Sequence, residues 1–148
     1  MKNQKVKNAT PSTYNGINFD SKLEMFCYQK LLENNIKSTY NENTYTLVEK
    51  YDYLGYEYPE KKTSKGNFRR VVLPITYTPD FVIQENIIIE CKGFADNKFP
   101  IKWKMFKKQL QDKFSDNLYL FMPRNQKQVL ECIEKIKLIQ HEPISTYD

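Results

Sequence analysis

Residues 77–93, YTPDFVIQENIIIECKG, are the stretch that decides the fold of this chain. Two short runs within it, residues 81–83 and 87–89, are apolar and mostly β-branched, a composition typical of buried strands. The three residues between them, 84–86, suit a hairpin loop, and Asn86 tolerates the left-handed backbone conformation that such a loop needs. The stretch therefore predicts an antiparallel β-hairpin.

This hairpin brings two carboxylates together. A three-residue loop pairs Ile83 with Ile87, and counting along the ladder then places Asp80 opposite Glu90 on one face, with Cβ atoms roughly 4.5–5.5 Å apart. A two-residue loop would place the two acids on opposite faces. Lys92 lies two residues beyond Glu90, so its side chain leaves the sheet on the same face. We therefore expect two acids and one ammonium to share that face.

Like charges directly opposite each other destabilise a sheet, so the pair Asp80 and Glu90 calls for a cation. Oxygen ligands at this separation suit Mg²⁺ or Mn²⁺ far better than zinc. With Lys92 beside it, such a metal fits hydrolysis of a phosphodiester, because the metal activates a water and the ammonium stabilises negative charge. The alternative is an exposed edge hairpin in which Lys92 is only a salt-bridge partner. The apolar run 87–89 argues against it, since unpaired carboxylates are costly in a buried strand.

Composition bounds the class of protein. The chain has 148 residues, of which 40% are apolar and 28% charged, and this suits one globular domain with a core. The net charge of +5 favours an anionic partner. Three cysteines without CxxC spacing and a single histidine argue against a zinc site and for reduced thiols. There is no apolar run of the ~20 residues that a membrane span needs, so we expect a soluble, cytoplasmic protein.

Local signals predict three helices. The first is expected to begin at Ser21, because Ser21 and Glu24 fit the S-x-x-E capping box. A second is expected from about Pro100, since proline suits the first helical turn. A third is expected to follow Asn125, which can cap its first turn.

Strand-like segments lie between these helices. Residues 39–53 and 68–83 are rich in β-formers, and 117–122 read as a last strand. With the run at 87–89, the order helix, three strands, helix, strand, helix predicts a mixed α/β domain with one sheet flanked by helices. Residues 1–16 are polar and basic and are expected to form a flexible arm, which leaves 17–148 as the domain.

The spacing of the site residues resembles a known signature. Pro79-Asp80, nine residues, and Glu90-Cys91-Lys92 are similar to the PD…(D/E)xK pattern of a large superfamily of metal-dependent nucleases. More closely, YTPDF…IIIECKG resembles the phage endonuclease I type of Holliday junction resolvase. NGINFDSKLEMFCYQKL and FPIKWKMFK look like the small phage resolvase-like endonucleases of that superfamily. The similarity runs from about residue 15 to residue 122.

The resemblance implies a restriction-endonuclease-like αβββαβ core, followed here by an extra C-terminal helix. It implies that Asp80 and Glu90 bind the metal with the backbone carbonyl of Cys91, and that Lys92 serves catalysis. A glutamate on the first helix completes the site in such enzymes, and Glu24 is the matching position, binding the metal directly or through a water. A purely structural role for Glu24 in the capping box is the alternative. The thiol of Cys91 is expected to point to the opposite, apolar face.

Two groups of basic residues are expected to contact DNA phosphates, and the N-terminal lysines Lys2, Lys5 and Lys7 form a third cluster. A solvated helix face is the alternative for the first group. No base-reading motif accompanies either group, so we expect recognition of DNA shape rather than of a fixed sequence. The first group lies on the second helix and the second in and after a long, exposed loop around residue 60: Lys102, Lys104, Lys107 and Lys108; Lys61, Lys62, Lys65, Arg69 and Arg70.

The expected function is therefore a Mg²⁺- or Mn²⁺-dependent endonuclease of branched DNA, such as a four-way junction, in phage recombination or genome processing. Symmetric cutting of two strands implies a C2 homodimer. A phage-encoded enzyme would work in the cytoplasm of the bacterial host. Three alternatives stay open: the same chemistry on linear duplex or as a nicking enzyme, a DNA-binding module that does not cut, and an α/β domain whose basic surface meets a protein.

Overall fold

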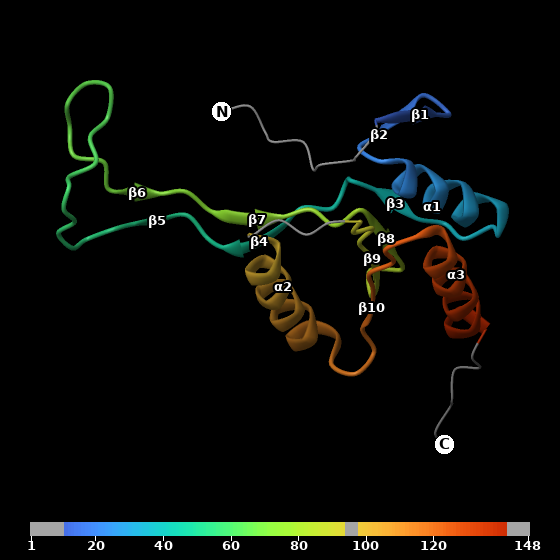
Figure 1. Ribbon diagram of the computed structural model, residues 1–148. Helices are drawn as coiled ribbons and strands as arrows, with labels where there is room; N and C mark the ends of the chain where they lie inside the picture. Colours follow the sequence, from blue (N-terminus) through green and yellow to red (C-terminus); the bar gives the residue numbers. More distant parts are fainter. Residues whose placement is uncertain (1–10, 94–97, 142–148) are drawn as a thin grey trace, which may run out of the picture.

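The computed structural model describes residues 11–93 and 98–141 and is mixed α/β (Figure 1). All three predicted helices are confirmed: α1 (Lys22–Glu33), α2 (Phe99–Phe114) and α3 (Gln126–His141). Ser21 caps α1, because its Oγ accepts the N–H of Glu24 at 3.1 Å. Asn125 does the same for α3, where its Oδ1 accepts the N–H of Gln128 at 2.9 Å. Within the two described ranges, no helix is long and apolar enough to cross a membrane.

A mixed four-stranded sheet lies at the centre. Its strand order is β10-β9-β8-β3, with β9 and β10 parallel and the other neighbours antiparallel. The register pairs Ile83 with Ile87 and Phe81 with Ile89, which confirms the three-residue hairpin. The strands are β3 (Thr39–Tyr40), β8 (Phe81–Ile83), β9 (Ile87–Ile89) and β10 (Tyr119–Phe121).

The hairpin loop differs from the prediction in one respect. The left-handed residues are Gln84, with φ of 52°, and Glu85, with φ of 64°, and not Asn86. Asn86 instead joins the hairpin to the segment before β10: its Nδ2 donates to the carbonyl of Asn117 at 2.9 Å, and its own carbonyl accepts the N–H of Tyr119 at 2.9 Å. Asn86 is thus hydrogen-bonded to the segment that leads into β10, the strand parallel to β9. The left-handed turn is made by the two residues before it.

The predicted mixed sheet flanked by helices is confirmed, but three two-stranded sheets accompany it in the described chain. Proline cannot donate to a ladder, and Pro74 and Pro79 bound β7 on its two sides. The partner strand of β7 is also irregular, with a register shift between Thr46 and Val48. The small sheets are β1 (Ser12–Tyr14) with β2 (Ile17–Phe19), β4 (Tyr45–Val48) with β7 (Ile75–Tyr77), and β5 (Tyr51–Asp52) with β6 (Val71–Val72).

The N-terminal boundary also differs from the prediction. β1 and β2 form a hairpin whose turn is Asn15 and Gly16, both at positive φ, so residues 12–16 are part of the folded structure. Residues 1–10 of the predicted flexible N-terminal segment lie outside the described residues.

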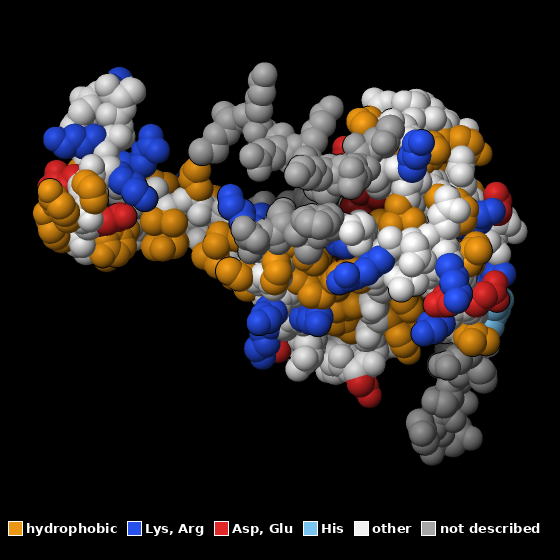
Figure 2. Space-filling view, in the orientation of Figure 1, with side chains coloured by type: hydrophobic (Ala, Val, Ile, Leu, Met, Phe, Trp, Pro, Cys, Tyr) orange, Lys and Arg blue, Asp and Glu red, His pale blue; other side chains and the backbone are white. Residues whose placement is uncertain are grey.

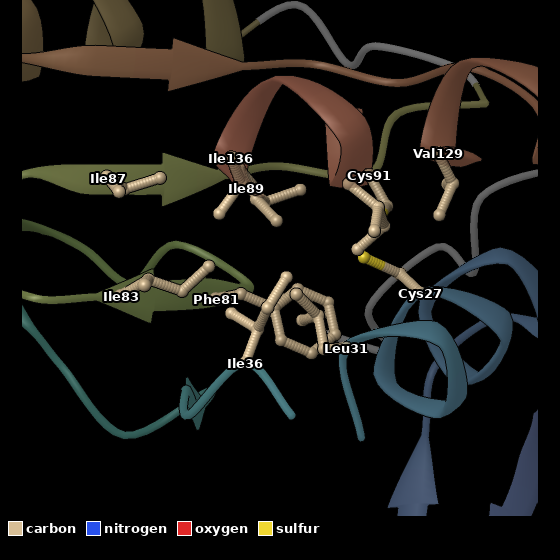
Figure 3. Close-up of a cluster of buried hydrophobic side chains, with 11 residues drawn as sticks. Cys27, Leu31, Ile36, Phe81, Ile83, Ile87, Ile89, Cys91, Val129 and Ile136 are labelled. Atoms are coloured by element: carbon tan, nitrogen blue, oxygen red, sulfur yellow. The ribbon is translucent and has the colours of Figure 1, made fainter. Parts of the chain in front are cut away.

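Two apolar clusters sandwich the central sheet. One packs against α1 and α3 and includes Ile87, Ile89 and Cys91 of the β9 segment (Figure 3). The other packs against α2 and includes Ile88, with the predicted stripe of α2 facing it. Alternate residues of β9 thus point to opposite faces, which places Glu90 on the α2 face. The α2 stripe consists of Trp103, Phe106 and Leu110, all buried, and Phe114, which is partly buried.

Candidate active site

Asp80 and Glu90 lie side by side at the end of the hairpin, as predicted. The backbone N–H of Asp80 donates to Oε2 of Glu90 at 3.1 Å. In return, the backbone N–H of Cys91 donates to Oδ2 of Asp80 at 2.7 Å. Each carboxylate is therefore held by the backbone of the opposite strand, which fixes the pair through main-chain geometry.

Lys92 lies beside this pair. Its Nζ is 3.5 Å from Oε1 of Glu90, and it also lies 4.3 Å from the centre of the Phe99 ring. Glu90 is buried, with 5% of its surface exposed, and the Lys92 side chain is 20% exposed. The ammonium is thus held between a buried carboxylate and an aromatic face, where it can offset negative charge on the α2 face.

Glu24 approaches the pair from α1. Its carboxylate is buried and accepts the hydroxyl of Tyr40 at 2.7 Å. The charge of Glu24 contributes to the raised pKa of Asp80 and of Cys91. In the other direction, the charge of Glu90 contributes to the raised pKa of Glu24. Glu24 therefore takes part in the helix cap through its backbone while its side chain belongs to the acidic group.

Burial and mutual repulsion disfavour the ionised acids. The pKa of Asp80 lies well above its usual value, first because of burial and then because of the charges of Glu90 and Glu24. Burial also raises the pKa of Glu90, against the opposing hydrogen bond from Tyr77 and the charge of Lys92. Burial raises the pKa of Glu24 as well. The charge of Lys92 opposes the rise at Asp80 and Glu90, and a divalent cation would offset the negative charge that this single ammonium leaves.

The donor atoms fit a hard divalent cation bound partly by water. In the residues that the structure describes, no group of three or more His, Cys, Asp or Glu side chains is arranged to enclose a metal ion. Mg²⁺, however, is commonly held by one or two carboxylates and keeps several waters. The inter-strand hydrogen bonds use Oδ2 of Asp80 and Oε2 of Glu90, and Oε1 of Glu90 lies 3.5 Å from the Lys92 ammonium, so a metal ion would bind Oδ1 of Asp80 and share Oε1 of Glu90 with Lys92. The Cys91 carbonyl as a further ligand stays a prediction.

The thiol of Cys91 plays no part in this group. It lies in the apolar cluster on the opposite face, where Figure 3 shows it beside Cys27. The contact with the Cys27 thiol and burial both hold the pKa of Cys91 well above its usual value. The Cys91 side chain is therefore part of the apolar core, as predicted.

The family described as "Protein of unknown function (DUF1064)" matches residues 4–126, more than half of the chain. The chain belongs to this family. The DUF1064 match contains Glu24, Asp80, Glu90 and Lys92, so the complete acidic group lies within the family region. Neither the curated proteins nor the solved structures gave a match. The geometry of the site is therefore the evidence on which a function for this DUF1064 protein rests.

The structure separates the two predicted basic groups of this DUF1064 protein. On α2, Lys104, Lys107 and Lys108 are exposed, Lys102 is partly buried, and Lys108 pairs with Asp112 at 2.9 Å. The second group lies on a long hairpin that projects from the body (Figure 1). Its members are all exposed: Lys61, Lys62, Lys65, Arg69 and Arg70.

Two site residues of this DUF1064 protein were not predicted. Tyr77 donates its hydroxyl to Oε2 of Glu90 at 2.7 Å, and Tyr40 donates to Glu24. Burial and the neighbouring carboxylates raise the pKa of both tyrosines, so both hydroxyls stay protonated and donate. A tyrosine within a predicted strand was the one signal in the sequence, because a buried tyrosine hydroxyl usually has a hydrogen-bond partner. Nothing in the sequence showed which acid each would meet.

If Glu90 binds Mg²⁺, we expect Tyr77→Phe to weaken that binding by about 10- to 100-fold, because ligand carboxylates depend on the groups that orient them. The loss of this donor also raises the pKa of Glu90 further, so the pH at which metal binding is half-maximal shifts upward. Titration of the thermal midpoint with Mg²⁺ at several pH values measures both effects. The control is Tyr45→Phe, whose ring packs on Phe106 in the same apolar cluster. Equal Mg²⁺ affinity in the two variants would contradict the role given to Tyr77.

Proposed function

We propose that this DUF1064 protein is a divalent-metal-dependent endonuclease that hydrolyses phosphodiester bonds in branched DNA. The observation that carries the proposal is the pair Asp80 and Glu90, hydrogen-bonded to each other's strands, with the Lys92 ammonium 3.5 Å from Glu90. Buried acids are costly unless a cation or hydrogen bonds compensate for them. Glu90, which is buried, and Asp80, which is partly buried, beside Lys92 support a site for cation-assisted chemistry on an anionic substrate, with buried Glu24 near them.

Each residue has a distinct role in this proposal. Asp80 and Glu90 would hold Mg²⁺ or Mn²⁺, with the Cys91 carbonyl and with Glu24 directly or through a water. The metal supplies polarisation of the phosphate and a lowered pKa of its bound water. Lys92 stabilises the negative charge that develops on the attacking and phosphate oxygens. Its contacts with Glu90 and Phe99 keep the ammonium in one position, which favours this role.

The order of the elements supports a restriction-endonuclease-like core. α1 precedes the hairpin β8–β9, and α2 then connects β9 to β10, which is parallel to β9. Two parallel strands need such a crossover connection. The crossover helix α2 packs on the face of the sheet on which Asp80 and Glu90 lie. This arrangement agrees with the αβββαβ order that the PD…(D/E)xK resemblance implies, with α3 as the additional C-terminal helix.

The substrate side of the proposal rests on charge. The exposed lysines of α2 follow the site by one loop and suit contacts with phosphates on either side of the cut. Paired cuts in a four-way junction call for two sites related by a two-fold axis, so the working unit proposed is a homodimer.

We expect the protein to cut a four-way junction in Mg²⁺ or Mn²⁺ and to leave a linear duplex of the same sequence intact. Denaturing gels of end-labelled strands measure both, with EDTA as the control. Equal cutting of the two substrates would favour a duplex or nicking nuclease. Binding without cutting would favour a DNA-binding module.

A further inference from the structure

A long β-hairpin leaves the body of the molecule between β4 and β7. We call residues 49–73 the arm. Within it β5 pairs with β6, with Tyr51 opposite Val72, and a further bridge joins Lys62 to Phe68. Figure 1 shows the arm extending well away from the central sheet and the three helices. It is thus a two-stranded ribbon that extends into solvent and adds no residue to the core of the protein.

Backbone hydrogen bonds hold the arm in shape. The N–H of Tyr53 donates to the carbonyl of Arg70 at 2.7 Å, and the N–H of Thr63 donates to that of Asn67 at 2.8 Å. Gly66, at φ of +81°, makes the turn at the tip. No residue of the arm is buried. A lone hairpin without a core adds little to stability, so its size points to a partner outside the domain.

The far half of the arm is basic. Residues 61–70 contain five basic and no acidic residues. Lys61 pairs with Glu57 at 3.5 Å, and the guanidinium of Arg70 lies 5.5 Å from the centre of the Phe68 ring. Figure 2 shows Lys and Arg side chains on both edges of the far end of the arm. The charge calls for an anionic partner, and it opposes self-association of two tips.

Exposed aromatic rings accompany these cations. Tyr58 is 82% and Tyr56 71% exposed, and Tyr51 and Tyr53 are also open to solvent. Cations that meet phosphates, together with rings that pack on sugars or bases, are a combination suited to nucleic acid. A two-stranded β-ribbon also has the dimensions of the major groove of B-DNA.

We propose that the arm is a DNA-docking element that lies along the duplex flanking the cut. This inference deepens the proposed function and rests on it for the position of the cut. Each side of the ribbon has about 12 residues, so its reach is at most ~40 Å at ~3.3 Å per residue. One turn of B-DNA is ~34 Å, or ~10 base pairs. The arm therefore makes binding depend on a duplex flank of about one turn.

Binding measured in EDTA tests the arm without any cleavage. The probes are junctions whose duplex branches are ~5 or ~20 base pairs long, followed by fluorescence anisotropy over a range of salt concentrations. The variants are Lys62→Gln/Lys65→Gln and Arg69→Gln/Arg70→Gln. The matched control is Lys127→Gln/Lys135→Gln, which removes two exposed lysines of α3.

We expect each arm pair to bind the long-branched junction about 10-fold more weakly at 0.1 M salt and to reduce the salt slope by ~2. The control pair stays within twofold of the unmodified protein, and the short-branched junction is bound almost equally by all variants. Arm variants that behave like the control would overturn the inference. So would unchanged DNA binding with a lower sedimentation mass, which would assign the arm to contacts between copies of the chain.

The same design separates this inference from the proposed function. If the unmodified protein binds through the arm but does not cut any junction, the nuclease proposal fails and the docking role stands. If it cuts junctions and the arm pairs bind as the control does, the docking role fails and the nuclease proposal stands.

Discussion

Glu90→Gln is expected to reduce cleavage of a four-way junction by ~10³-fold or more while junction binding in EDTA stays within about threefold. The amide keeps an oxygen that can accept from Tyr77 and from the backbone of Asp80, so the local hydrogen bonds and the fold survive. What is lost is the negative charge that would hold the metal and pair with Lys92.

Lys92→Ala is expected to give a loss of similar size with a different signature. Mg²⁺ binding persists in this variant, because both carboxylates remain, whereas Glu90→Gln loses it. Single-turnover cleavage of labelled junctions measures the rates, and the Mg²⁺ dependence of the thermal midpoint measures metal binding.

Two controls test the site assignment. Glu85→Gln removes an exposed carboxylate from the loop of the same hairpin, and Lys127→Ala removes an exposed lysine of α3. Both are expected to cut at the normal rate. Full activity of Glu90→Gln or of Lys92→Ala would remove the basis of the proposed function.

Asp80→Asn is expected to stabilise the metal-free protein at pH 7.5, raising the thermal midpoint by about 3–8 °C. The folded-state pKa of Asp80 lies well above its usual value, so the folded protein holds this proton more tightly than the unfolded chain does. Stability is therefore greatest below the unfolded pKa of ~4 and falls as the pH rises through the raised folded pKa. The amide removes that loss and can still accept the N–H of Cys91.

Mg²⁺ should reverse the order of stability. At a concentration 100-fold above its dissociation constant, a ligand bound only by the folded state adds ~2.7 kcal/mol. The unmodified protein should gain this stability at pH 7.5, and Asp80→Asn should gain little. Differential scanning fluorimetry between pH 4 and 8, with Mg²⁺ or EDTA, follows both effects. A metal-free midpoint that rises through this pH range, or one that Mg²⁺ does not move, would contradict the account of the acidic group.

The sequence alone determined the local parts of the site. The hairpin register followed from loop length and from the two-residue period of a strand, and this register brought Asp80 and Glu90 together. The starts of α1 and α3 followed from Ser21 and Asn125, because a helix cap joins residues only a few positions apart.

Tertiary structure decided what depends on distant segments. Tyr40 and Tyr77 reach their acids because β3 pairs with β8 and β7 pairs with β4, and neither pairing has a signal within a short window of sequence. The conformation of the hairpin loop depends on a hydrogen bond to a distant segment, because Asn86 donates to Asn117, just before β10. The arm likewise became visible as a separate ribbon only in three dimensions. Local periodicity positions side chains along one element, whereas contacts between elements depend on how the whole chain packs.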